Sequence, residues 1–107
     1  MNEGLEGLDA AFTYLPVGSV VTLVGGERPV VVAGVMACDG NTGRYWDYLA
    51  YPYPEGRQDA TQDHFFDMEM VEELLQLGFV EREAVGFQLW LAARTDEYRK
   101  VRERQGK

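Results

Sequence analysis

The sequence predicts an α+β fold, with a small antiparallel sheet of three to five strands followed by one C-terminal helix. Two apolar, β-branched runs at 17–24 and 30–36 are joined by turn residues, and a third run at 44–53 follows a second turn. Residues 81–104 then repeat apolar side chains at helical spacing. Consecutive strands followed by a helix are typical of the α+β class.

At 107 residues, the chain is expected to form a single domain over residues 1–107. Residues 1–13 are rich in glycine and glutamate, and we expect a lead-in segment or a short helix around 8–12. Residues 14–80 are expected to be mainly β, and residues 81–104 to form the C-terminal helix.

The first two strands are expected to pair as a hairpin. Val17–Val24 and Val30–Met36 suit strands because β-branched side chains pack well on a pleated surface. The residues between them, Gly25-Gly26-Glu27-Arg28-Pro29, have the composition of a turn. This short connection predicts an antiparallel pair.

The third strand is expected over Arg44–Tyr53, after the turn residues of Asp39–Gly43. Pro52 has no N–H to donate to a neighbouring strand, so this end should lie at a sheet edge or a bulge. Short strands joined by tight turns indicate a small, partly open barrel of the SH3-like kind. A flat meander with the helix on one face is the alternative.

The segment at 67–77 allows two interpretations, a helix or a turn followed by a strand. Val71 and Leu74 have helical spacing, whereas Leu75 and Leu77 alternate as in a strand. The residues alone leave both interpretations open.

The apolar stripe of the C-terminal helix suggests two functional parts. Phe87 and Leu91 share one stripe, and we expect Phe87→Ala to destabilise the domain by about 3 kcal/mol or more, as core truncations do. Beyond Arg94 the helix becomes charged. We therefore expect that removing residues 95–107 barely changes folding but weakens binding to a partner, because Tyr98 and the basic end are lost.

The net charge of −8 is unevenly distributed along the chain. Residues 1–93 carry 4 basic and 15 acidic residues, a net of −11, and residues 94–107 carry 6 basic and 3 acidic residues, a net of +3. An acidic surface opposes binding to nucleic acid, which requires a basic one, and docking to anionic lipid. It fits a solvated surface or a protein partner with basic patches.

The sequence also predicts a cytoplasmic protein without membrane insertion. No apolar run approaches the ~20 residues of a membrane span, and the first residues lack the basic-then-apolar pattern of a signal peptide. The single cysteine, Cys38, excludes an internal disulfide and fits a reducing compartment.

Few residues could carry catalysis. Ser19, the only serine, lies in a strand pattern that lacks a nucleophile elbow. Cys38 and His64 could form a nucleophile–base pair oriented by Asp63 or Asp67. Without a local sequence signature, however, such a pair is only weak evidence for a catalytic site. One Cys and one His are too few for a structural zinc site. We therefore expect no enzymatic activity, no bound metal and no cofactor.

Aromatic side chains gather in the third strand and recur in the helix. Five Tyr and Trp residues lie within residues 45–53, on both faces of the expected strand, and a small domain cannot easily bury both faces. Tyr and Trp are frequent in interface hot spots, although core and cross-strand packing is the alternative. The candidate partner-binding residues are Trp46, Tyr48, Tyr51, Tyr53, Phe87, Trp90, Leu91 and Tyr98.

Short motifs in a fixed order are Leu15-Pro16-Val17-Gly18-Ser19-Val20-Val21, Gly25-Gly26, Asp47-Tyr48, Tyr53-Pro54-Glu55-Gly56, Phe65-Phe66-Asp67 and Gly78-Phe79. Over residues 14–80 they resemble an uncharacterised family of small proteins from Gram-positive bacteria. That family is often encoded at type VII secretion loci, beside LXG-type toxins and their small helical targeting partners. The family pattern favours a helical turn at 67–72 and a strand near 74–80.

The resemblance implies a chaperone or targeting adaptor for an exported toxin, and it supplies no catalytic motif. An immunity protein that occludes the toxin's active site is the alternative within the binding class. A small hydrolase using Cys38 and His64 is the alternative from a different class. The chain departs from the family pattern at Asp39–Gly43 and in the long, basic-ended helix beyond Arg94, where we expect partner specificity to lie.

Overall fold

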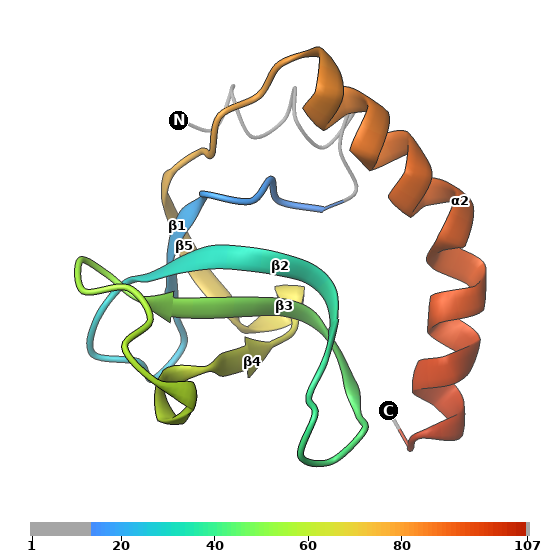
Figure 1. Cartoon of the computed structure of the whole chain (residues 1–107), viewed down its shortest axis with the longest axis horizontal. Helices are drawn as coiled ribbons and strands as arrows, with labels where there is room; N and C mark the ends of the chain where they lie inside the picture. Colours follow the sequence, from blue (N-terminus) through green and yellow to red (C-terminus); the bar gives the residue numbers. More distant parts are fainter. Residues whose placement is uncertain (1–13, 107) are drawn as a thin grey trace.

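The structure is a computed structural model that describes residues 14–106, and it consists of one antiparallel sheet and one long helix (Figure 1). The strands lie in the order β4-β3-β2-β1-β5, so the α+β class with an open antiparallel sheet and a C-terminal helix is confirmed. The expected lead-in at 1–13 lies outside the described residues. The elements are β1 (Val20–Leu23), β2 (Val30–Cys38), β3 (Tyr45–Pro52), η1 (Ala60–Gln62), β4 (His64–Phe66), η2 (Met68–Met70), β5 (Val71–Gln76) and α2 (Arg82–Arg104).

The first three strands form two consecutive hairpins, as the turn residues predict. Val20 lies opposite Val31 in the β1–β2 pair, and Val32 lies opposite Ala50 in the β2–β3 pair. The first strand is shorter than expected, because the Ser19 N–H donates to the Pro16 carbonyl at 3.1 Å and closes a turn before β1.

The long strand β2 is bent. Its register against β3 shifts between Val32 and Gly34, and Met36 has a φ of 51°, in the left-handed region that side chains rarely adopt. Such a residue costs on the order of 1 kcal/mol or more, which the surrounding structure must offset. In Figure 1 the tip of the β2–β3 hairpin curves down to lie beside the C-terminal end of α2.

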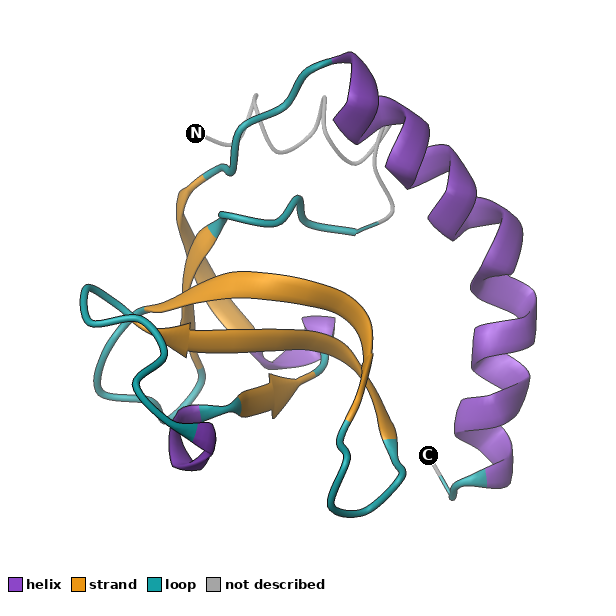
Figure 2. Cartoon of the chain, viewed as in Figure 1, coloured by secondary structure: helices purple, strands orange, loops and turns teal. Residues whose placement is uncertain are grey.

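Residues 68–77 form a helical turn followed by a strand, and the helical interpretation is wrong. Figure 2 shows η2 directly after the short strand β4. The next strand, β5, pairs with β1 and places Leu74 opposite Val21. It begins at Val71, three residues before the expected start, because the 3₁₀ turn of η2 is a single turn.

A close backbone contact fixes the end of β5 against the start of β1. A Cβ at Gly78 would come within 2.8 Å of the Ser19 nitrogen, so only glycine allows this approach. The Gly78 N–H donates to the Ser19 hydroxyl oxygen at 3.0 Å, and Ser19 is fully buried. Ser19 therefore has a structural role.

The core lies on the inner side of the curved sheet. Tyr48 is fully buried and stacks on Phe66 with ring centroids 5.3 Å apart, and its hydroxyl accepts a hydrogen bond from the Leu15 N–H at 2.9 Å. Among the described residues of α2, Leu91 joins this core. The core residues are Tyr14, Leu15, Val21, Val30, Val32, Tyr48, Ala50, Phe66, Leu74 and Leu91.

Two glutamine side chains connect α2 to the rest of the domain. Gln88 forms two hydrogen bonds with the Tyr14 backbone, accepting from its N–H at 3.3 Å and donating to its carbonyl at 2.9 Å. Gln105 accepts from the Tyr45 N–H at 3.0 Å and donates to the Gly43 carbonyl at 3.0 Å. The helix is thus attached to the entering chain near its beginning and to the β2–β3 hairpin at its end.

The expected core position of Phe87 is wrong, since this side chain is 43% exposed. The buried face of α2 instead runs through Gln88, Leu91, Tyr98 and Arg102. Two of these four residues are polar or charged, and their long-range hydrogen bonds make burial acceptable. A prediction from the spacing of apolar residues leaves out polar residues such as Gln88 and Arg102. It therefore placed the buried face of the helix closer to Phe87 than it is.

The distal part of α2 does not outrun the core, contrary to the sequence prediction. Tyr98 and Arg102 are each 8% exposed. Removing residues 95–107 would therefore take buried groups from the domain, and the expectation that this truncation barely changes folding is withdrawn.

Candidate partner-binding site

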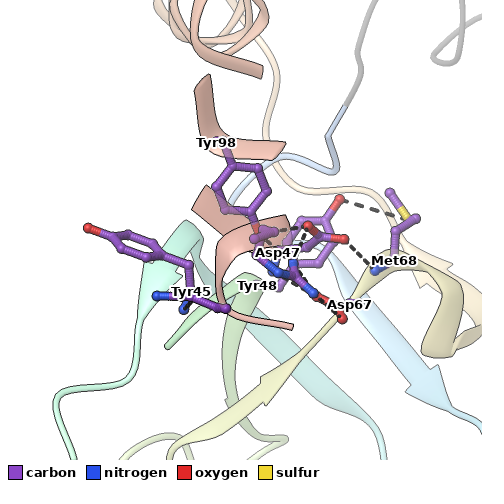
Figure 3. Close-up of polar contacts among 8 residues, drawn as sticks. Tyr45, Asp47, Tyr48, Asp67, Met68 and Tyr98 are labelled. Atoms are coloured by element: carbon purple, nitrogen blue, oxygen red, sulfur yellow. Dashed lines mark hydrogen bonds and ion pairs between the residues drawn. The ribbon is translucent and has the colours of Figure 1, made fainter. Parts of the chain in front are cut away.

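A buried polar cluster attaches the distal part of α2 to the sheet. It consists of Asp47 on β3, Asp67 after β4, and Tyr98 and Arg102 on α2 (Figure 3). Arg102 donates to both carboxylate oxygens of Asp67, at 2.9 and 2.8 Å. This two-point contact is the strongest geometry for a guanidinium–carboxylate pair.

Asp47 joins the cluster from the neighbouring strand. Its carboxylate accepts hydrogen bonds from the Tyr98 hydroxyl at 2.8 Å and the Met68 N–H at 3.0 Å. Arg102 lies 3.3 Å from the same carboxylate and also donates to the Tyr98 hydroxyl oxygen at 2.8 Å. Two acidic groups and one guanidinium thus share a single network.

Burial and pairing shift the ionisation of this cluster. Burial raises the pKa of the Tyr98 hydroxyl above its usual value, and its hydrogen bond to Asp47 raises it further. The hydrogen bonds to Asp67 raise the pKa of the Arg102 guanidinium. Tyr98 and Arg102 therefore both hold their protons across the physiological range.

A solvent-facing aromatic stack lies on the flank of α2. Phe87 and Trp90 are 43% and 49% exposed, with ring centroids 5.7 Å apart and planes inclined by 14°. The Arg94 guanidinium lies over the Trp90 ring at 3.9 Å from its centroid. We refer to Phe87, Trp90 and Arg94 as the aromatic flank.

A groove continues the aromatic flank toward the bent β2–β3 hairpin. Its volume is about 370 Å³. One wall is α2 and the other is the sheet, where Met36, the residue with positive φ, contributes. The groove is lined by Val35, Met36, Tyr45, Trp90, Arg94, Glu97, Tyr98 and Val101.

The structure divides the sequence-predicted binding residues into three groups by their exposure to solvent. Tyr48, Leu91 and Tyr98 are buried, at 0%, 1% and 8% exposure, so they act through the fold. Trp46 and Tyr51 on β3 are half-buried, and Arg44 lies over the Trp46 ring at 4.7 Å. The exposed residues are Tyr53, Phe87 and Trp90, of which the last two lie together.

Sequence reasoning missed Arg94 and the groove residues Val35 and Met36. The signal in the sequence is the absence of charged residues between positions 84 and 93. In the structure, only Gln88 and Leu91 of this segment are buried. A helix segment that is apolar on most of its circumference needs a cover on more than one side. No pattern in the sequence places β2 beside this segment.

Cys38 and His64 are not brought together. In the sheet Cys38 lies opposite Tyr45 and His64 lies opposite Ala50, on the two sides of β3. Five residues along a strand correspond to about 17 Å, far beyond hydrogen-bond reach. Within residues 14–106, no three His, Cys, Asp or Glu side chains are grouped to hold a metal ion.

No helix within the described part of the chain combines the length and the hydrophobicity needed to cross a membrane. The sheet and the single long helix of the described residues define a small α+β domain that exposes the aromatic flank to solvent. The chain belongs to the family described as a domain of unknown function, DUF4176, whose model matches residues 14–87. No curated protein and no solved structure is significantly similar to it.

Proposed function

We propose that this protein is a small cytoplasmic chaperone or targeting adaptor that binds a type VII secretion substrate of the LXG toxin class. The observation that carries the binding role is the aromatic flank, Phe87, Trp90 and Arg94, which lies exposed beside a groove of about 370 Å³. The secretion substrate is proposed from the ordered motifs between residues 14 and 80.

The residue types of the aromatic flank suit a protein interface. Trp and Arg are among the residues that contribute most to binding energy when they are buried at an interface centre. The stacking of Phe87 on Trp90 fixes both rings before a partner arrives, so little side-chain entropy is lost on binding. Arg94 covers the outer side of the stack and can turn its remaining donors to partner carboxylates or carbonyls.

The groove determines what kind of segment fits. Its lining is mixed, with slightly more apolar than polar surface, and carries one cationic and one anionic side chain, Arg94 and Glu97, on the helix wall. An amphipathic helix from the partner would place its apolar side chains in such a groove. Helical segments are what a targeting region of an exported substrate would offer under this proposal.

The test is binding to the toxin encoded beside the gene, measured separately for its N-terminal part and its toxic C-terminal part. A chaperone or adaptor should bind the N-terminal part. Trp90→Ala should weaken that binding by roughly tenfold or more, as hot-spot truncations do. Leu75→Ala on β5, 47% exposed against 49% for Trp90, is the matched control and should change the affinity less than twofold.

The same measurement examines the alternative of an immunity protein. The net charge of −8 favours a basic toxin domain as the ligand in that case. Binding confined to the toxic C-terminal part, with loss of toxin activity, would replace the chaperone proposal. Binding to neither part would contradict both proposals.

A further inference from the structure

A second exposed surface of α2 faces away from the domain and is distinct from the aromatic flank. Leu89 at its centre is 68% exposed and Val85 is 44% exposed. Successive residues of a helix are rotated by about 100°, so Leu89 points roughly opposite to the buried Leu91 and about 100° from Trp90. In Figure 1 the helix α2 lies along one edge of the molecule. We call Arg82, Val85, Gly86, Leu89, Ala93 and Asp96 the outer ridge.

The charges of the outer ridge are arranged symmetrically about Leu89. Arg82 precedes Leu89 by seven residues and Asp96 follows it by seven, so each lies two turns, or about 10 Å, from the centre on the same side of the helix. Among the described residues, neither Arg82 nor Asp96 has an ion-pair partner. Each end of the ridge thus carries a charge that is unpaired within the described domain.

An antiparallel pair of such helices would satisfy both charges. With a two-fold axis at Leu89, Arg82 of one copy lies beside Asp96 of the other, and the same contact recurs on the other side of the axis. A parallel pair would bring Arg82 to Arg82 and Asp96 to Asp96, which repel. The charges of Arg82 and Asp96 therefore favour the antiparallel over the parallel orientation of a second copy of this chain.

Small residues on the outer ridge and beside it allow the helices to approach closely. Ala92 and Ala93 are exposed, and the position of a Cβ on Gly86 is open, with nothing within 4 Å. In the antiparallel arrangement Val85 and Gly86 of one copy lie against Ala93 and Ala92 of the other. A larger side chain is thus matched with a smaller one on each side of the Leu89 contact, as close packing requires.

We propose that the outer ridge is the interface of a homodimer, in which two α2 helices pack antiparallel about a two-fold axis near Leu89. The aromatic flank and its groove remain free on both copies, so the dimer presents two partner-binding sites. The proposal uses different residues from the proposed function and stands independently of it.

The test is the mass of the full chain in solution, measured by light scattering and sedimentation at about 100 μM, where an interface with micromolar Kd is largely occupied. The wild type should be a dimer. Leu89→Glu and Asp96→Arg should each give a monomer with an unchanged melting temperature at low concentration. The double variant Arg82→Asp with Asp96→Arg restores opposite charges and should recover the dimer.

Val24→Glu is the control, because Val24 is 69% exposed on a distant turn and its replacement should leave the dimer intact. A monomeric wild type, or a dimer that persists in both Leu89→Glu and Asp96→Arg, would overturn the proposal. If the wild type is monomeric and Leu89→Glu lowers its melting temperature, another part of the same chain covers the outer ridge. This result would also overturn the dimer proposal.

Discussion

Between Ala84 and Ala93, α2 carries no charged side chain, whereas between Arg94 and Gln105 it carries eight. The first segment exposes Leu89, Phe87 and Trp90 to solvent. The second buries Tyr98 and Arg102 against two aspartates of the sheet. The apolar segment is thus the more open one, and the charged segment is the more firmly attached to its own domain.

This contrast shows that burial in α2 follows available partners more than hydrophobicity. Arg102 is buried because Asp67 and Asp47 accept hydrogen bonds from its two terminal guanidinium nitrogens. Trp90 remains half exposed because the described domain covers only part of it. The stacked, exposed pair of Phe87 and Trp90 is the basis of the proposed partner-binding surface.

The largest effect is expected when the charged segment is removed. A chain that ends after Arg94 loses Tyr98 and Arg102, and it leaves two carboxylates, Asp47 and Asp67, without their cation. Uncompensated buried charge and lost packing should together unfold most of the population. Circular dichroism and thermal melts of the shortened chain measure this. A shortened chain that melts like the wild type would show that the cluster contributes little.

A single substitution within the cluster should have a smaller but still large effect. Arg102→Met keeps much of the side-chain volume but removes the guanidinium that pairs with the buried Asp67, and such a change costs about 3 kcal/mol or more. Arg99→Met, at an exposed position one turn earlier, is the matched control and should stay within about 0.5 kcal/mol. Chemical denaturation gives both free energies. Equal costs at the two positions would contradict the assigned role of Arg102.

Alkaline conditions should weaken the same attachment. Burial raises the pKa values of the Tyr48 and Tyr98 hydroxyls above the value of about 10 in the unfolded chain. Their contribution to stability is fully present below about pH 10, and it is lost as the pH rises through the pKa values of the folded state.

Thermal melts between about pH 8 and pH 12 should therefore show a falling midpoint above about pH 10. Because Tyr98→Phe removes one of these phenols, its midpoint should fall less steeply over this range. Tyrosinate absorbance, followed in parallel, should show these groups ionising late. Identical slopes for the wild type and Tyr98→Phe would show that ionisation of Tyr98 does not contribute to the loss of stability at high pH.

The smallest effect on stability is expected in the apolar segment. Phe87→Ala should cost less than about 1 kcal/mol, because the side chain is 43% exposed and leaves no closed cavity. Leu91→Ala, four residues later and 1% exposed, should cost about 2–5 kcal/mol. Denaturation midpoints of the two variants sharpen the comparison, and a larger loss for Phe87→Ala would return this residue to the core.

The sheet was largely predictable because its signals are local. The β-branched runs and the turn residues define β1, β2 and β3. At 67–77 the residues left a helix and a strand open, and the family resemblance favoured the strand, which is β5. The orientation of α2 was not predictable in the same way. Its buried face depends on Gln88 and Arg102, whose partners Tyr14 and Asp67 lie 74 and 35 residues away.

The candidate site was predictable in part for the same reason. The aromatic composition identified Phe87 and Trp90, but it equally selected Tyr48 and Leu91, which the fold buries. Residue type indicates which side chains could bind a partner, and only the arrangement of the sheet shows which of them remain accessible. The groove depends on the bend of β2 at Met36, for which no turn residue in the sequence gives a signal.

The two glutamine contacts of α2 have a consequence for the order of folding. Gln88 and Gln105 bond to backbone groups 74 and 60–62 residues earlier in the chain. Such distant contacts close long loops and form late, since the entropy of closure must be overcome first. The helix can form locally within microseconds, but it can dock only after Tyr14 and the β2–β3 hairpin are in place. The sheet must therefore form before α2 can dock against it.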